Sequence, residues 1–204
     1  MIREPDAIEK RSMEIIESEL TVEIPAEVKD IVKRVIHCTA DFDYAKNLVF
    51  SENAVRRAHE ALLAGCDIVT DTQMVRAGIN KAAAARLGCT LYCFMSDPDV
   101  AEEAKRRGCT RAAVSMQRAT RLDRPLIFAV GNAPTALLTL SEQIREGRLD
   151  PVLVVGVPVG FVNILESKEA LMASGAEYIV SRGRKGGSNV AAAIINALMY
   201  RITR

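Results

Sequence analysis

Tryptophan is absent from this chain, and aromatic residues make up only 4% of it. A platform that stacks nucleic-acid bases needs aromatic side chains, so such a surface is poorly supported. An excess of one charge is also missing, because 27 Lys and Arg balance 26 Asp and Glu for a net charge of +1. This balance gives no reason to expect nucleic acid or an anionic membrane as a partner.

Long hydrophobic runs are missing as well. No apolar stretch approaches the roughly 20 residues that are needed to span a bilayer. Residues 1–6 have neither the basic start nor the apolar stretch of a signal peptide. We therefore expect a cytoplasmic protein without a membrane partner.

Cysteines are few, and their spacing does not pair them. The chain has five, an odd number, and no Cys-x-x-Cys motif occurs. This argues against a disulfide framework in a chain of 204 residues. The two histidines are distant in sequence from any cysteine pair, so we expect no zinc site. The cysteines are expected to be reduced and mostly buried.

Short β-branched runs alternate with helical patterns from residue 67 onward. The runs predict strands over 67–70, 90–95, 126–130, 152–157 and 177–180, each followed by a helix. Buried strands separated by helices imply a mostly parallel sheet with helices on both faces. The expected fold class is α/β: a single three-layer α/β/α domain over residues 1–204, with a helical N-terminal lead-in.

The lead-in contains two amphipathic helical patterns and a short extended piece. Residues 4–20 predict a helix with a buried stripe that includes Ile8, Ile15 and Ile16. A second helix starts near Pro25 and ends around His37. The extended piece covers residues 48–50, and Ser51 is expected to cap a helix over 52–64.

Three Gly-rich turns follow predicted strands, at residues 131–134, 156–160 and 182–188. Ligands of open α/β sheets bind outside the carboxyl ends of the strands, where unpaired N–H groups at helix starts favour anions. None of the turns is a recognised phosphate loop. Any one of them is explained by turn geometry, but together with Arg182, Arg184 and Lys185 they favour a large anionic ligand. Arg111, at another helix start, is a further candidate for binding a carboxylate.

His37 is the one credible acid or base of the chain. It ends a predicted helix and is followed by Asp41 and Asp43, so it could donate or accept a proton. It could equally offset the helix dipole, with Asp41 as a local cap. No nucleophile motif accompanies it. Ser12, in the middle of the first helix, is explained equally well by a solvent-facing or back-bonded hydroxyl.

Several motifs occur together and in order along the chain. They are residues 7–12 with Ile15-Ile16, Val35-Ile36-His37, Thr70-Asp71 with Met74-Val75, Thr110-Arg111, residues 131–137, residues 156–162 with Glu166-Ser167-Lys168, and residues 182–188. This set resembles the precorrin-8X methylmutases, enzymes of cobalamin biosynthesis. The resemblance runs from about Ala7 to about Leu198 without large gaps, which makes it far more specific than any single glycine turn.

The resemblance implies an isomerase that moves a methyl group within precorrin-8X or cobalt-precorrin-8. The methyl leaves the α carbon of ring C for the adjacent ring C carbon, and the product is hydrogenobyrinate or cobyrinate. Because this 1,5-sigmatropic shift is intramolecular, no methyl donor or redox cofactor is implied. The resemblance also implies a homodimer with the site near the subunit interface.

The same resemblance implies roles for individual residues. His37 matches the active-site histidine and is expected to act as a general acid on the conjugated macrocycle, while Asp41 and Asp43 keep open roles as local caps or as groups that tune its pKa. The expected substrate-binding residues are Ser12, Asp71, Thr72, Arg111, Gly183, Arg184, Lys185, Gly186, Gly187 and Ser188.

Two other functions stay open at this point. The first is a corrinoid carrier that binds the product and hands it on without chemistry. The second is a Rossmann-like enzyme for a nucleotide or sugar phosphate, which the strand–glycine–helix turns alone would permit. The motifs also leave open whether the natural substrate contains cobalt.

Overall fold

In the computed structural model, which describes residues 3–204, six strands form one sheet in the order β1-β6-β5-β4-β2-β3. Every neighbouring pair is parallel except β1 with β6, which is antiparallel. The predicted mostly parallel sheet is therefore confirmed. The strands are β1 (Leu48–Phe50), β2 (Asp67–Thr70), β3 (Thr90–Tyr92), β4 (Leu126–Val130), β5 (Leu153–Gly156) and β6 (Tyr178–Ser181).

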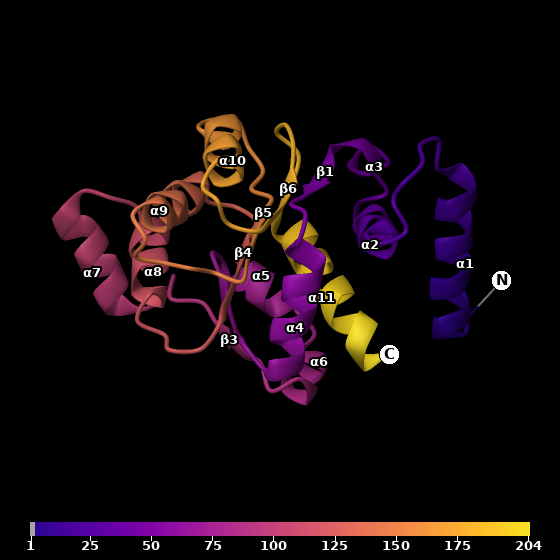
Figure 1. Cartoon of the computed structure of the whole chain (residues 1–204), viewed down its shortest axis with the longest axis horizontal. Helices are drawn as coiled ribbons and strands as arrows, with labels where there is room; N and C mark the ends of the chain where they lie inside the picture. Colours follow the sequence, from indigo (N-terminus) through magenta and orange to yellow (C-terminus); the bar gives the residue numbers. More distant parts are fainter. Residues whose placement is uncertain (1–2) are drawn as a thin grey trace.

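Helices cover both faces of this sheet, as Figure 1 shows. One face packs against α2 (Lys29–Thr39), α4 (Ala54–Ala64), α5 (Gln73–Gly78), α6 (Lys81–Arg86) and α11 (Ser188–Thr203). The other face packs against α8 (Arg111–Ala119), α9 (Pro134–Arg145) and α10 (Ile164–Met172), with α7 (Pro98–Arg107) outside α8. The predicted three-layer arrangement is therefore confirmed.

Strand β4 shows why both faces of the sheet must be covered by helices. Its five residues are all buried. Because side chains alternate along a strand, Ile127 and Ala129 join the core under α11 while Phe128 joins the core under α8 and α9. A strand that is apolar on both faces is stable only between two layers of helices.

The N-terminal helix α1 (Pro5–Glu19) forms the lead-in and packs beside α2 at the rim of the molecule (Figure 1). Its start follows local rules, with Pro5 in the first turn and the Glu4 carboxylate accepting the N–H of Asp6 and Ala7. The predicted buried stripe is only partly correct. Ile16 is buried, but Ile8 and Ile15 are 45% and 40% exposed. Packing against α2 buries only part of the apolar surface of α1.

The chain runs through the short helix α3 (Tyr44–Asn47) into β1, which is an edge strand of the sheet. The extended pattern at residues 48–50 predicted this strand. Ser51 does not cap α4, so that prediction is wrong. Its hydroxyl donates to the Glu177 carboxylate and accepts the N–H of Tyr178. The pairing of β1 with β6 places Ser51 beside these residues, which are distant in sequence.

Candidate active site

The turns that follow β2, β4, β5 and β6 meet at the carboxyl edge of the sheet. Residues 182–188, which we call the glycine loop, lie against the other turns. The Thr72 hydroxyl is 3.1 Å from the Ser188 hydroxyl, and Gly187 donates its N–H to the Val157 carbonyl at 2.9 Å. Gly160, after β5, donates to the Arg184 carbonyl at 3.2 Å. The predicted anion-binding turns are thus parts of one continuous surface.

Glycine is required where these turns touch. A Cβ on Gly186 would lie 2.1 Å from the Val157 carbonyl oxygen, far closer than a Cβ approaches a neighbouring atom in real proteins. A Cβ on Gly131 would lie 2.7 Å from the Cα of Ser188. Gly183 meets no such obstacle, but its φ of 78° lies in the left-handed region that favours glycine. Both close approach and backbone conformation therefore set the shape of the glycine loop.

Asp71 supports the turn after β4 from below. It is fully buried, and its carboxylate accepts the N–H groups of Gly131, Asn132 and Ala133 at 2.9, 2.7 and 2.7 Å. Burial raises the pKa of Asp71, and the three N–H donors oppose that rise. The resemblance implied direct substrate binding, but this carboxylate does not reach the surface where a substrate would lie. Its contacts hold the turn in place.

His37 lies in the last turn of α2 and is exposed, with no hydrogen-bond partner within residues 3–204. The next residue, Cys38, places its sulfur 3.9 Å from the Asn189 carbonyl oxygen, in the first turn of α11. The end of α2, which carries His37, therefore lies beside the first turn of α11. Desolvation raises the pKa of the Cys38 thiol, so this neighbour stays protonated at neutral pH.

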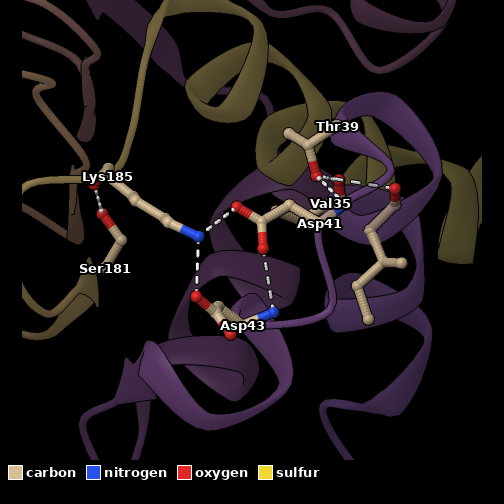
Figure 2. Close-up of polar contacts among 7 residues, drawn as sticks. Val35, Thr39, Asp41, Asp43, Ser181 and Lys185 are labelled. Atoms are coloured by element: carbon tan, nitrogen blue, oxygen red, sulfur yellow. Dashed lines mark hydrogen bonds and ion pairs between the residues drawn. The ribbon is translucent and has the colours of Figure 1, made fainter.

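Asp41 and Asp43 bind the glycine loop from the turn that follows α2. Figure 2 shows the Lys185 ammonium between their carboxylates, at 2.6 Å from Asp41 and 2.7 Å from Asp43. Lys185 lowers the pKa of Asp41, which also accepts the N–H of Asp43 at 3.0 Å. Neither aspartate forms a hydrogen bond with His37 within the described part of the chain. Their main partner is Lys185, a role that the sequence did not suggest.

Arg184 and Phe161 form an exposed rim of the site. The guanidinium carbon of Arg184 lies 5.6 Å from the centre of the Phe161 ring, within reach of a cation–π contact. Phe161 and Val162 are 82% and 76% exposed. Arg184 has no carboxylate partner within residues 3–204, so its charge is open to a ligand. The rim therefore combines an exposed apolar surface with a cation.

Arg111 and Ser12 lie apart from this cluster. Arg111 is the first residue of α8 and donates to the Met95 carbonyl at 3.3 Å. Its neighbour Thr110 contacts Thr135 at the start of α9, which places Arg111 near the same edge of the sheet. Ser12 donates to the Ile8 carbonyl within α1 at 2.8 Å and makes no hydrogen bond with the other candidates. This chain alone does not bring Ser12 to His37.

Lys168 contacts the glycine loop from beneath, and the sequence assigned it no role. It is 2% exposed on α10, and its ammonium donates to the carbonyls of Gly183 and Lys185 at 2.7 and 3.0 Å and to the Ser181 hydroxyl at 3.2 Å. Desolvation lowers the pKa of Lys168 to about 8. The sequence contained one signal for its burial, because Lys168 shares the helical spacing of the apolar residues Ile164 and Leu171.

Other features of the molecule do not involve the candidates. A cleft of about 540 Å³ between α7 and α8 is lined by residues such as Phe94, Arg107 and Arg118 and by none of the candidate residues. Within residues 3–204, no three His, Cys, Asp or Glu side chains are grouped so as to hold a metal ion. Over the same residues, no helix is long and apolar enough to cross a membrane. The candidate site therefore lies outside this cleft.

Comparison with known proteins places this geometry in a family. A family model described as precorrin-8X methylmutase matches residues 7–201. The cobalt-precorrin-8 methylmutase of Leptospira interrogans is 43% identical, over 94% of this chain and 91% of the relative. The precorrin-8X methylmutase of Pseudomonas aeruginosa is 39% identical, over 97% and 96%.

A solved structure agrees with these relatives. The crystal structure of precorrin-8X methylmutase from Thermus thermophilus aligns with a TM-score of 0.87 and 38% identity, over 95% of this chain and 96% of that one. The sequence, the fold and the ordered motifs around His37 and the glycine loop thus lead to one assignment. This chain is an enzyme that belongs to the precorrin-8X methylmutase family.

Proposed function

We propose that this enzyme moves a methyl group within precorrin-8X or cobalt-precorrin-8, from the ring C α carbon to the adjacent ring C carbon. The product would be hydrogenobyrinate or cobyrinate, and a cytoplasmic location belongs to the same proposal. The observation that carries the proposal is that the end of α2, with exposed His37, lies beside the first turn of α11, where Cys38 contacts Asn189. This contact supports a proton donor near a surface that suits carboxylates.

Backbone N–H groups supply much of that surface. Within residues 3–204, the N–H groups of Gly183, Arg184, Lys185 and Gly186 have no acceptor, and α11 begins at Ser188, the last residue of the loop. Unpaired N–H groups and the positive end of a helix dipole favour anions. The side-chain carboxylates of the substrate would therefore bind here, with Arg184 as a cationic partner and the Thr72 and Ser188 hydroxyls at the border. Arg111, at the same edge of the sheet, would bind a further carboxylate.

The proposed reaction requires the protein to orient the substrate and to donate a proton to it. One carbon–carbon bond to the methyl breaks and another forms within the same molecule, so no co-reactant is consumed. His37 acts as the general acid, which protonates or hydrogen-bonds the conjugated macrocycle and makes the methyl-bearing system more electron-poor. The exposed rim at Phe161 would cover part of the apolar ring face.

A second copy of the chain would complete the site. Ile8 and Ile15 are exposed on α1, and Ser12 lies on that helix without contact to the other candidates. We therefore include in the proposal a homodimer in which α1 is covered by the partner and Ser12 of one chain reaches the substrate of the other. This arrangement would also close a surface that is open in a single chain.

Replacement of the two histidines provides the central test. His37→Ala should lower kcat for methyl migration about 10²- to 10⁴-fold, the usual contribution of a general acid. Migration is followed in the visible spectrum with precorrin-8X and with its cobalt form. His59→Ala, on α4, is the matched control and should leave turnover unchanged. Normal turnover by His37→Ala would refute the acid role.

The two alternatives predict different outcomes in the same experiments. A corrinoid carrier would bind hydrogenobyrinate but show no migration in the wild type. A nucleotide or sugar-phosphate enzyme would be stabilised in thermal-shift assays by those ligands and not by corrinoids. The proposed isomerase should turn over, bind its product in both the wild type and His37→Ala, and show no stabilisation by nucleotides.

A further inference from the structure

Lys168 is a buried cation without a carboxylate. The residue is 2% exposed, and within residues 3–204 its ammonium forms hydrogen bonds with neutral oxygens and no ion pair. Burial of an ammonium group is costly unless polar groups replace its water. All three of its hydrogen bonds go to one short segment, at Ser181, Gly183 and Lys185. An apolar side chain would fill this position on α10 without that cost.

The geometry of the peptide bond shows what these hydrogen bonds do. In a trans peptide the carbonyl of one residue and the N–H of the next point in opposite directions. No cis peptide is present among the described residues. Because the Gly183 and Lys185 carbonyls point towards the buried ammonium, the N–H groups of Arg184 and Gly186 point away from it. Those two N–H groups have no acceptor within residues 3–204.

Lys185 extends the effect to the other side of the site. Its carbonyl accepts from Lys168 and from the Ser181 hydroxyl, at 3.0 and 2.8 Å. Its side chain reaches the turn after α2 and binds Asp41 and Asp43 (Figure 2). The residue whose backbone Lys168 holds is therefore the one that joins the glycine loop to the segment carrying His37.

We propose that Lys168 is a positioning residue of this enzyme: its ammonium holds the Gly183 and Lys185 carbonyls inward and so directs the Arg184 and Gly186 N–H groups towards the substrate carboxylates. This inference rests on the proposed function, because it assigns a purpose to the loop that the proposal makes the carboxylate site. Lys168 itself does not touch the substrate. It acts through the loop backbone.

The protonation state of Lys168 gives the inference a distinct signature. A neutral amine has two N–H donors and a lone pair, so it cannot donate to all three oxygens. Since desolvation lowers the pKa of Lys168 to about 8, the amine loses its proton as pH rises through that value. The loop then loses a hydrogen bond, and substrate binding weakens. KM should therefore rise on the alkaline side of about pH 8.

Other ionisable groups on the neighbouring elements do not contact this amine. The ionisable groups on these elements are Glu166 and Glu169 of α10, Glu142 and Arg145 of α9, Tyr178 of β6, and Arg182, Arg184 and Lys185 of the glycine loop. None of their side chains forms a hydrogen bond or ion pair with the Lys168 nitrogen. Desolvation is the one cause of its lowered pKa. Substitution of Lys168 can therefore show whether its titration causes the rise of KM at alkaline pH.

The experiment compares Lys168→Met and Lys168→Arg with the wild type. Lys168→Met should raise KM about tenfold or more and change kcat much less, because it removes hydrogen bonds that shape the binding loop. Lys168→Arg keeps a charge over the whole pH range. It should restore part of the affinity and abolish the rise of KM above about pH 8. Product binding by each variant is measured in parallel with hydrogenobyrinate.

Leu171→Ala is the control for a general loss of stability. Leu171 is fully buried three residues further along α10, in the same apolar core as Leu137 and Leu140. Its truncation weakens the core but should leave KM and its pH profile as in the wild type. An equal rise of KM in Leu171→Ala would overturn the proposal. So would an unchanged KM in Lys168→Met, or an alkaline rise that persists in Lys168→Arg.

The outcomes separate this inference from the proposed function. If the wild type binds hydrogenobyrinate without turnover, the isomerase proposal fails, while weaker binding by Lys168→Met still supports the positioning role. If Lys168→Met does not fold, the pH profiles of the wild type and Lys168→Arg decide the matter. Absence of corrinoid binding by the wild type would overturn both.

Discussion

The Lys185 ammonium lies 2.6 Å from the Asp41 carboxylate, although the two residues are 144 positions apart in sequence. The contact joins the glycine loop to the turn that follows the His37 helix. Asp43 binds the same ammonium at 2.7 Å, so two neighbouring carboxylates share one cation. Because the pair spans the two halves of the candidate site, its removal should affect substrate binding more than folding.

Removal of the ammonium should change the titration of Asp41. Lys185 lowers the pKa of Asp41, so the ion pair stabilises the fold above the ordinary aspartate pKa near 4 and this contribution is lost as pH falls through the lowered value. In Lys185→Met the Asp41 pKa should move back upwards, as read from carboxyl chemical shifts in an NMR titration. The variant should also lower kcat/KM about two- to fivefold, the scale of an exposed ion pair. An unmoved Asp41 pKa would contradict the assignment.

Gly186→Ala tests the close approach of the glycine loop to the turn after β5. The new Cβ would overlap the Val157 carbonyl, so the loop must shift. We expect a loss of about 2 kcal/mol or more in the free energy of unfolding, measured by chemical denaturation, together with a higher KM. Gly183→Ala, which meets no atom within 4 Å, should cost only about 1–2 kcal/mol through its left-handed backbone. Equal effects of the two changes would refute the steric argument.

Asp71→Asn tests the support of the turn after β4. The amide offers fewer acceptor positions than the carboxylate, so at least one of the three N–H groups loses its partner in the interior. The expected cost is about 1–3 kcal/mol in the free energy of unfolding, from a denaturation midpoint with an unchanged slope. The exposed Asp123→Asn is the control and should stay within about 0.5 kcal/mol of the wild type. Wild-type stability of Asp71→Asn would show that the carboxylate is not needed.

The double change Ile8→Glu, Ile15→Glu tests the proposed homodimer. Two charges on the exposed apolar side of α1 should separate the subunits and lower kcat/KM, because Ser12 would no longer reach the partner's site. Sedimentation velocity measures the subunit state. Leu63→Glu on α4, where the side chain is 59% exposed, is the matched control and should change neither property. A wild type that sediments as a monomer with full activity would rule out the shared site.

Much of the fold follows from local sequence signals. Pro98 and Pro134 begin α7 and α9, and the apolar runs at residues 126–130 and 152–157 contain β4 and β5. These rules work because a proline at a helix start and a run of buried β-branched residues act within a few neighbours. Ser51 shows the limit of this reasoning. Its position just before a helical pattern predicts an N-cap. The pairing of β1 with β6 instead brings its hydroxyl into hydrogen bonds with Glu177 and Tyr178.

By itself, the sequence determined the α/β class, the order of the strands and the family, because each depends on patterns or motifs that are continuous along the chain. Only the tertiary structure decided which side chains meet. It assigned Asp41 and Asp43 to Lys185, buried Asp71 beneath its turn, and placed Lys168 under the glycine loop. Hydrogen bonds and ion pairs act over about 3 Å, and the distances between residues far apart in sequence exist only once the sheet has brought its turns together.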